Sequence, residues 1–377
     1  MIDKIFRWIP FIMLYFPFKI FSLFSGKKNV YLFGTGTGYF HDNPKYLFLK
    51  FLKLKNLKEE VYWVAKTNKV YNELKQKDYP VIKRNSLLAA YYAAVAKAFI
   101  VSAELFDVAY FINDYTKLVQ LWHGTPIKHI GMDNKIDSDR NEKKAKWLGK
   151  NYTFDRFDLY FVDEQEYIPI FLSAFGCKKE KIKPFGQIRN EVWSDKSLKE
   201  KITKDLELES YSRILLYAPT YRDRPEDNIS LIKSLIQKVA VNKLKENNFI
   251  LLIKLHPFLT NGTIDFPSEI INHDNVLDVS SHADFQELLL ISDCLITDLS
   301  SCILDYKYSG KPFFSFFPDK EKYIMSRNGM YSDSKNIIES NNNIISEIYD
   351  YRESLDIPDF KVESFQILSE IKKEYIN

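Results

Sequence analysis

The feature that most constrains this chain is an alternation, found twice, of short apolar or β-branched runs with longer amphipathic stretches. The short runs predict strands, and the amphipathic stretches predict helices. Strands that alternate with helices along a chain form parallel sheets with helices on their faces. The first series predicts strands at Val30–Phe33, Val61–Ala65, Phe99–Ser102, Leu118–Leu121 and Asp158–Val162, and helices at Pro44–Lys55, Tyr71–Lys77 and Ser86–Ala96.

A second series begins near residue 212. It predicts strands at Ile214–Ala218, Phe249–Leu255, Val276–Asp278, Cys294–Thr297 and Phe313–Phe316, and helices at Ile229–Leu244, Asp284–Ile291 and Ser301–Tyr308. Two such series in 377 residues predict two Rossmann-like domains facing each other across a cleft, since one domain typically holds about 100–200 residues. Ligands of such sheets bind beyond the carboxyl ends of the strands. The charged segment 186–212 is the expected hinge, and the tail from residue 336 is expected to be helical with a break at Pro358.

The first 28 residues differ from the rest of the chain in charge and aromatic content. The whole chain carries 53 basic and 50 acidic residues, but residues 1–28 hold five basic groups and one acidic group, which leaves the remainder at −1. This near-neutral balance argues against a surface built for duplex nucleic acid. The uncharged run Trp8–Phe18 is too short for a spanning helix, which needs about 20 apolar residues. We expect residues 1–28 to lie on an anionic membrane surface; the alternative is a helix packed on this protein or on a partner.

The cysteine and metal-ligand patterns exclude several classes of protein. Cys177, Cys294 and Cys302 are too few for a disulfide framework and include no CxxC pair. Cys294 and Cys302 stand in apolar surroundings, so we expect buried small hydrophobes and a reducing compartment. No DxD stands at a strand end, and no cluster of His, Cys and carboxylates has metal spacing. We therefore predict a reaction that needs no metal and no other cofactor.

Gly34, Gly36 and Gly38 follow the first expected strand and resemble a dinucleotide-binding loop. Tyr39 stands in place of the last glycine, and Lys66 rather than an acidic residue follows the second strand. The loop is therefore better explained as a turn that lets the chain approach a ligand or another backbone closely.

Two histidines follow apolar strands, one in each series. His123 lies in the motif Leu121–Lys128, where Gly124 allows close approach of a substrate and Lys128 is placed to face a phosphate. His256 follows Phe249–Leu255 and precedes Pro257, which fixes the turn. Histidine is the usual general base near neutral pH, and a strand end is where such sheets bind ligands. We predict that both histidines serve one site, although a structural role for either is the alternative.

Two further loops follow strands of the second series. Leu295–Ser301 leads into a helix, and the hydroxyls of Ser300 and Ser301 are expected to cap that helix. The free N–H groups of such a helix bind phosphate. Tyr217–Asp223 carries Arg222, whose planar guanidinium can clamp a phosphate; the alternative is a surface ion pair with the neighbouring aspartate.

Together these motifs resemble the CDP-glycerol glycerophosphotransferase family, the teichoic-acid type of polyol-phosphate transferases. The motifs are WHGTPIK at Trp122–Lys128, APTYRD at Ala218–Asp223, KLHP at Lys254–Pro257, LITDLSS at Leu295–Ser301, and the shorter Asp42-Asn43, Asp305-Tyr306 and Gly310-Lys311-Pro312. The likeness covers roughly residues 20 to 330. Ile188 and Glu191 depart from the family's G-x-P-R-N-D element, and Leu299 stands where the family often has tyrosine.

The resemblance implies an α/β fold of the GT-B-like kind, with the nucleotide held by the C-terminal domain. It implies that the histidines matching the motifs are essential and that Ser300 and Ser301 lie near the donor pyrophosphate. The expected donor-binding residues are Arg222, Thr297, Asp298, Ser300, Ser301 and Asp305. The expected substrate-binding residues are Asn43, Gly124, Thr125 and Lys128.

The expected activity is transfer of glycerol phosphate or ribitol phosphate from a CDP-activated polyol to a lipid-linked or polymeric acceptor, with release of CMP. His123 takes a proton from the acceptor hydroxyl, that oxygen attacks the donor's β-phosphorus, and His256 with Arg222 and the serines stabilises the pyrophosphate. The alternatives are a glycosyltransferase with a nucleotide-sugar donor and a non-catalytic membrane-bound scaffold. The expected location is the cytoplasmic face of a bacterial membrane, and an oligomer remains open.

The sequence also predicts how the chain is divided. Residues 1–28 are the membrane-associating segment, 29–190 an acceptor domain, 191–350 a CDP-donor domain and 351–377 a helical tail.

Overall fold

The computed structural model describes residues 9–55, 58–256, 273–326, 329–331, 348–349 and 366–371. Pro257, the expected break at Pro358 and the first eight residues lie outside these ranges. The chain divides into two compact units: one takes in Met1–His123, Ile130–Arg189 and Val362–Asn377, and the other takes in Gly124–His129 and Asn190–Lys361.

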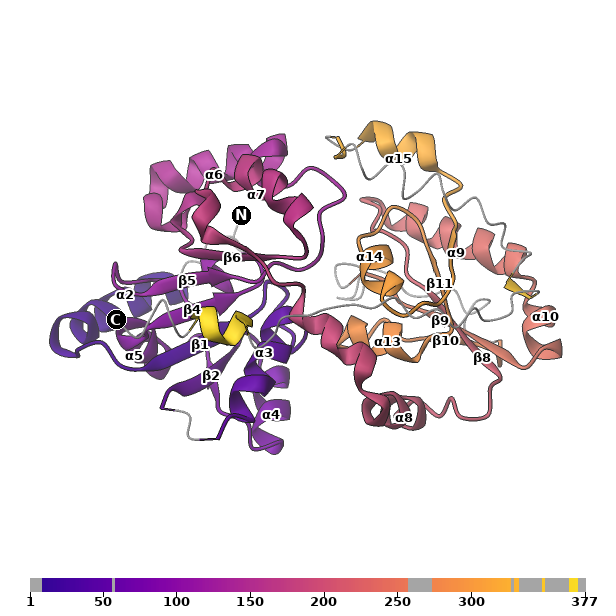
Figure 1. The fold of residues 1–377 in the computed structure, drawn as a ribbon, viewed down its shortest axis with the longest axis horizontal. Helices are drawn as coiled ribbons and strands as arrows, with labels where there is room; N and C mark the ends of the chain where they lie inside the picture. The colour runs from indigo at the N-terminus through magenta and orange to yellow at the C-terminus, as the bar shows by residue number, and fades with distance from the viewer. Residues whose placement is uncertain are drawn as a thin grey trace. The chain divides into compact units, whose positions relative to one another are not determined.

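The first unit is built on a seven-stranded sheet in the order β3-β2-β1-β4-β5-β6-β7, with every pairing parallel (Figure 1). The strands are β1 Val30–Gly34, β2 Glu60–Ala65, β3 Val81–Lys83, β4 Ala98–Val101, β5 Lys117–Gln120, β6 Leu159–Val162 and β7 Ile182–Pro184. The helices are α2 Ile9–Phe24, α3 Asp42–Leu52, α4 Asn68–Gln76, α5 Leu87–Val95, α6 Lys135–Leu148 and α7 Ile168–Phe175.

Alternate residues of each strand enter opposite cores of this sheet. In β1, Leu32 packs in a core with residues of α2, α5 and α7, whereas Tyr31 and Phe33 pack in a second core with residues of α3, α4 and the helical residues 366–371. A strand that is buried on both faces needs apolar residues at successive positions, which is why β1 is a continuous apolar run. The sheet is therefore the middle layer of three.

The second unit contains a five-stranded parallel sheet in the order β10-β9-β8-β11-β12. Its strands are β8 Arg213–Tyr217, β9 Phe249–Ile253, β10 Val276–Asp278, β11 Cys294–Thr297 and β12 Phe313–Ser315, and its helices are α8 Lys196–Asp205, α9 Pro225–Val239, α10 Val241–Glu246, α13 Phe285–Ile291, α14 Cys302–Lys307 and α15 Lys320–Ser326. The expected α/β architecture with two parallel sheets is confirmed, and Cys294 and Cys302 are buried and unpaired, as expected.

The sequence prediction was wrong where a local signal was weak or interrupted. The single helix expected at Ile229–Leu244 is two helices, because Ala240 adopts a left-handed conformation with φ of 53° between α9 and α10. Strands β3 and β7, each of three residues at an edge of its sheet, were missed, although the equally short edge strands β10 and β12 were predicted. Helix α6 was missed because none of its residues is buried, so it carries no apolar stripe.

Helix α2 occupies most of the N-terminal segment that the sequence assigned to a membrane surface. One side of it packs on the first unit: Leu14 and Phe18 are buried, and the Phe18 ring lies 5.2 Å from that of Phe111. The alternative of a helix packed on its own protein is thus correct for this side. No helix within the described ranges has both the length and the apolar character needed to cross a bilayer.

Gly34 shows why the glycine-rich turn follows β1. A Cβ atom at this position would lie 2.4 Å from the carbonyl oxygen of Asp107, so the two backbones approach as closely as only glycine permits. A Cβ at Gly36 would meet Ala103 at 3.2 Å. The expectation of a turn that approaches another backbone is confirmed: the turn packs on residues 102–107.

We predict that Gly34→Ala lowers the free energy of unfolding by about 1–3 kcal/mol, because the new methyl group must displace backbone atoms. Urea unfolding measures this change. Gly26→Ala is the matched control, since a Cβ there meets no atom within 4 Å, and it should not destabilise the protein. Equal stabilities for the two variants would contradict the close approach.

Candidate active site

His123 lies in the loop that follows β5 and is exposed. Its Nδ1 atom lies 2.8 Å from the carbonyl oxygen of Ser102, at the end of the neighbouring strand β4. A carbonyl oxygen only accepts hydrogen bonds, so Nδ1 carries the proton and Nε2 of the neutral ring has its lone pair available. The Trp122 ring stacks on the imidazole with a centroid distance of 4.2 Å. These contacts present Nε2 as a proton acceptor.

Asn43, expected to bind substrate, is buried beneath this loop. Its Nδ2 atom donates to the carbonyl oxygens of Leu121 at 3.2 Å and Trp122 at 3.1 Å, and also contacts Gln187. Its Oδ1 atom accepts from the backbone N–H of Arg189 at 3.1 Å. The side chain therefore holds in place the residues that follow β5, directly before His123, and the expected role of Asn43 in substrate binding stays a prediction.

Asp42, beside Asn43, adopts a left-handed backbone with φ of 65°. Its Oδ1 atom accepts from Arg189 at 2.7 Å. Burial by itself would raise the pKa of Asp42, but the guanidinium of Arg189 and the nearby His41 and His123 leave that pKa below its ordinary value. The carboxylate therefore stays charged near His123.

The remainder of the Trp122–Lys128 motif belongs to the second unit. Ile127 packs with Leu299 and Tyr323, and Lys128 donates from Nζ to the Tyr323 hydroxyl at 3.1 Å. Thr125 is buried, and Gly124 has φ of 135°, which other residues rarely adopt. Lys128 therefore contacts a tyrosine of α15, and its expected role in facing a substrate phosphate stays a prediction.

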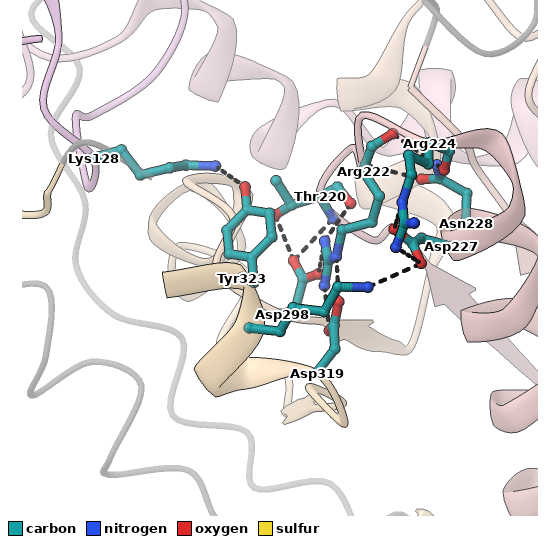
Figure 2. A network of polar contacts seen from close by, with 10 residues as sticks. Lys128, Thr220, Arg222, Arg224, Asp227, Asn228, Asp298, Asp319 and Tyr323 are labelled. Carbon is teal, nitrogen blue, oxygen red and sulfur yellow. Dashed lines mark hydrogen bonds and ion pairs between the residues drawn. The ribbon is translucent and has the colours of Figure 1, made fainter. Parts of the chain in front are cut away.

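The loops after β8 and β11 lie beside each other, because these strands are neighbours in the five-stranded sheet. In Figure 2, Arg222 joins them: its Nε and Nη2 atoms contact Asp319 at 2.7 and 2.8 Å, and its Nη1 atom lies 2.9 Å from Asp298. Asp298 in turn accepts from the N–H of Thr220 at 2.9 Å. The guanidinium carbon of Arg222 also lies 4.2 Å from the Tyr323 ring centroid.

The sequence left open whether Arg222 faces a ligand or pairs with the neighbouring Asp223. The Arg222 side chain is 5% exposed, and its partners are Asp319 and Asp298, not Asp223. In this structure the guanidinium bridges the loops after β8 and β11 and is not directed at solvent. Asp319 and Tyr323 were missed by sequence reasoning because neither stands in a recognisable motif.

Several other expected donor-binding residues point into the protein. Thr297 donates to the carbonyl oxygen of Ala218 at 2.6 Å, and Asp305 accepts from Gln286 at 3.1 Å; both are buried. The expectation that serine hydroxyls cap the following helix is wrong for α14. Ser301 already has helical dihedral angles at the N-cap position, and its side chain makes no capping hydrogen bond. Ser300 and Ser301 remain partly exposed at this strand end.

His256 follows β9 and is exposed, with its ring 5.8 Å from that of Tyr221 in the loop after β8. Lys254, two residues earlier, donates to the carbonyl oxygens of Ser280 and His282 at 2.8 and 2.7 Å, and burial lowers the pKa of its amine to about 8. The second histidine thus lies next to the Arg222 loop. No group of three or more His, Cys, Asp or Glu side chains in the described part of the chain is arranged to hold a metal ion.

We predict that Arg222→Met lowers the free energy of unfolding by about 3–5 kcal/mol, because it leaves the buried Asp298 without its counter-charge. The hydrogen bond from Arg222 holds the pKa of Asp319 below 3.8. The part of the lost unfolding free energy that comes from the Arg222–Asp319 pair is therefore present in full above about pH 4. It disappears as the pH falls through the lowered pKa of Asp319. Chemical unfolding at several pH values measures both effects.

Arg224→Met is the matched control. Arg224 lies on the same loop but is exposed, and its pair with Asp227 is a surface ion pair (Figure 2). Such a pair contributes about 0–1 kcal/mol. Equal losses in the two variants would contradict a bridging role for Arg222.

Comparisons with known proteins identify the family of this chain. Residues 15–366 match the family described as CDP-Glycerol:Poly(glycerophosphate) glycerophosphotransferase. A teichoic acid poly(glycerol phosphate) polymerase of Staphylococcus epidermidis is 32% identical over 66% of this chain, which spans 35% of that polymerase. A teichoic acid glycerol-phosphate transferase of Staphylococcus aureus is 28% identical, over 85% of this chain and 82% of the relative.

A solved structure of the wall teichoic acid polymerase TagF, in a variant soaked with CDPG, has the same fold. It superposes with a TM-score of 0.70 over 95% of this chain and 93% of that one, at 24% identity. The family match covers almost all of the described residues, including both histidine motifs. The chain therefore belongs to the CDP-glycerol:poly(glycerophosphate) glycerophosphotransferase family.

Proposed function

We propose that this protein transfers glycerol phosphate or ribitol phosphate from the CDP-activated polyol to a hydroxyl group of a saccharide or polyol acceptor, in the synthesis of a teichoic-acid-type or capsule-type polymer. The observation that carries this proposal is His123, whose Nδ1 is engaged by Ser102 so that Nε2 is left as a base. Membership of the family supports the choice of donor. The relatives named above are glycerol-phosphate enzymes, which supports glycerol as the first donor to test.

In the proposed reaction, Nε2 of His123 takes the proton from the acceptor hydroxyl as its oxygen attacks the β-phosphorus of the donor. The bond from that phosphorus to the bridging oxygen breaks, and CMP leaves. His256 and the partly exposed Ser300 and Ser301 stabilise charge on the pyrophosphate. Arg222 holds the two donor-side loops in position. Phosphoryl transfer depends mainly on this kind of positioning and charge stabilisation.

We predict that His123→Ala lowers the rate of CMP release from CDP-glycerol by about 10²–10⁴-fold in the presence of acceptor, which is the usual contribution of a general base. The matched control is His273→Gln, at an exposed turn histidine outside both motifs, which should retain the wild-type rate. A His123→Ala protein with the wild-type rate would overturn the mechanism.

A donor screen separates this function from a glycosyltransferase of similar fold. The purified protein is incubated with CDP-glycerol, CDP-ribitol and UDP-sugars, and the released nucleotide is identified. CMP from a CDP-polyol supports the proposal and names the polyol, whereas UDP from a UDP-sugar supports the rival. No turnover with any donor and acceptor would favour the non-catalytic scaffold.

We also propose that the protein lies on the cytoplasmic face of the cell membrane, where a lipid-linked acceptor is anchored. The side of α2 away from the core carries an exposed apolar patch, formed by Ile12, Met13, Phe16, Ile20, Leu23 and Phe24. Leu87 and Leu88 of α5, the helix on which α2 packs, are exposed as well. Lys19, Lys27 and Lys28 add positive charge to the same segment. Apolar side chains with flanking cations bind the interface of an anionic bilayer.

We predict that the double variant Phe16→Asp, Leu23→Asp binds phosphatidylglycerol vesicles at least about tenfold more weakly than the wild type, because it places two charges in the apolar patch. Cosedimentation at two salt concentrations measures the binding. Met325→Asp, at an 84% exposed side chain on α15, is the matched control and should bind as the wild type does. If the patch instead joins two copies of the chain, the double variant will lose a dimer in light scattering and keep its vesicle binding.

A further inference from the structure

A single peptide group connects His123 to a buried carboxylate in the first unit. The carbonyl oxygen of Ser102 accepts from the His123 ring at 2.8 Å. The N–H of the same peptide group is that of Ala103, and it donates to Oδ2 of Asp107 at 2.8 Å. The imidazole, the peptide group and the carboxylate are therefore linked by two consecutive hydrogen bonds.

Asp107 is held firmly in this position. Its Oδ2 atom also accepts from the N–H groups of Ser102 and Glu104, each at 3.2 Å, and its Oδ1 atom lies 3.5 Å from Nζ of Lys66. Lys66 donates in turn to the carbonyl oxygen of Gly36 at 2.9 Å. Burial raises the pKa of Asp107, whereas Lys66 and the backbone N–H groups oppose that rise. The glycines of the turn after β1 leave room for this arrangement.

The geometry points to Asp107 as a positioning residue for His123, acting through the Ser102–Ala103 peptide group. Hydrogen bonds in a chain polarise one another, so a carboxylate at the N–H end makes the carbonyl at the other end a stronger acceptor. A stronger acceptor fixes the proton on Nδ1 and stabilises the imidazolium that forms when Nε2 takes a proton. The inference rests on the proposed role of His123 as the base.

The simpler explanation is that Asp107 only closes the 3₁₀ turn Leu105–Asp107, where it forms a capping box with Glu104. That role accounts for the bond to the N–H of Glu104 but not for the shorter bond to Ala103. A purely structural role predicts a loss of stability and no change in the titration of the catalytic base. The pH dependence of the reaction therefore distinguishes the two.

The test is the pH profile of kcat/KM for CMP release by Asp107→Asn. The amide keeps an oxygen that accepts from Ala103 but removes the charge, so kcat/KM should fall about tenfold and the acidic limb should move to lower pH by about half a unit or more. The other charged groups around this network stay the same in both proteins: Lys66, Arg84, Glu104, Lys144, His41 and Asp42.

Asp158→Asn is the matched control. Asp158 likewise accepts from a backbone N–H, that of Leu118, and pairs with Arg156, but it lies at the opposite end of β5 from His123. The Asp158→Asn variant should lower the free energy of unfolding without moving the acidic limb of the kcat/KM profile. Coincident profiles for the two variants would overturn the inference.

A second measurement does not depend on turnover. Nitrogen-15 NMR of histidine-labelled protein reports which ring nitrogen carries the proton, and a His123→Gln sample assigns the signal. The wild type should show the Nδ1–H form, and Asp107→Asn should shift that signal towards a mixture of tautomers; identical spectra would refute the inference. If the His123→Ala protein retains the wild-type rate, the proposed function itself fails. If the His123→Ala protein is inactive but the Asp107→Asn protein has the wild-type spectra and pH profile, only the inference about Asp107 fails.

Discussion

The parallel direction of the strands is the constraint from which the candidate site follows. Because all pairings among the described strands are parallel, the carboxyl ends of neighbouring strands lie at one edge of each sheet. The loop residues at that edge no longer pair with a neighbouring strand, so their backbone N–H and C=O groups need other hydrogen-bond partners. Side chains supply these partners: Asn43 at the end of β5, Asp107 at the end of β4 and Asp298 between the loops after β8 and β11.

In each unit, a buried carboxylate fixes backbone N–H groups and is compensated by one cation. Asp107 has Lys66, and Asp298 has Arg222. Burying such a pair is expensive in desolvation, so it is weak support for overall stability. What it provides is a defined loop geometry, and a reaction that depends on positioning gains directly from loops that do not need to reorganise.

The sequence predicted the strands well because apolar runs and helical periodicity are local signals. It also predicted that His123 and His256 follow strands, since a histidine directly after an apolar run is visible in the sequence; their catalytic roles stay a prediction. It did not find Asp319, which lies 97 residues from its partner Arg222 and leaves no local pattern. Nor did it show that Thr297 points into the core, because a one-residue change in register reverses which face a side chain occupies.

The residues around His123 adopt conformations that need support from their surroundings. Trp122 has φ of 58° and Gly124 has φ of 135°, on either side of the histidine. A left-handed non-glycine residue costs about 1–3 kcal/mol and persists only where its neighbours hold it. The hydrogen bonds from Asn43 hold Trp122, and the packing of Ile127 on Tyr323 holds the chain beyond Gly124. Within the first unit, the backbone of Trp122 is therefore held by Asn43, and the His123 ring by the carbonyl oxygen of Ser102 and the stacked Trp122 ring, so a change at Asn43 alters the surroundings of His123 without touching its side chain.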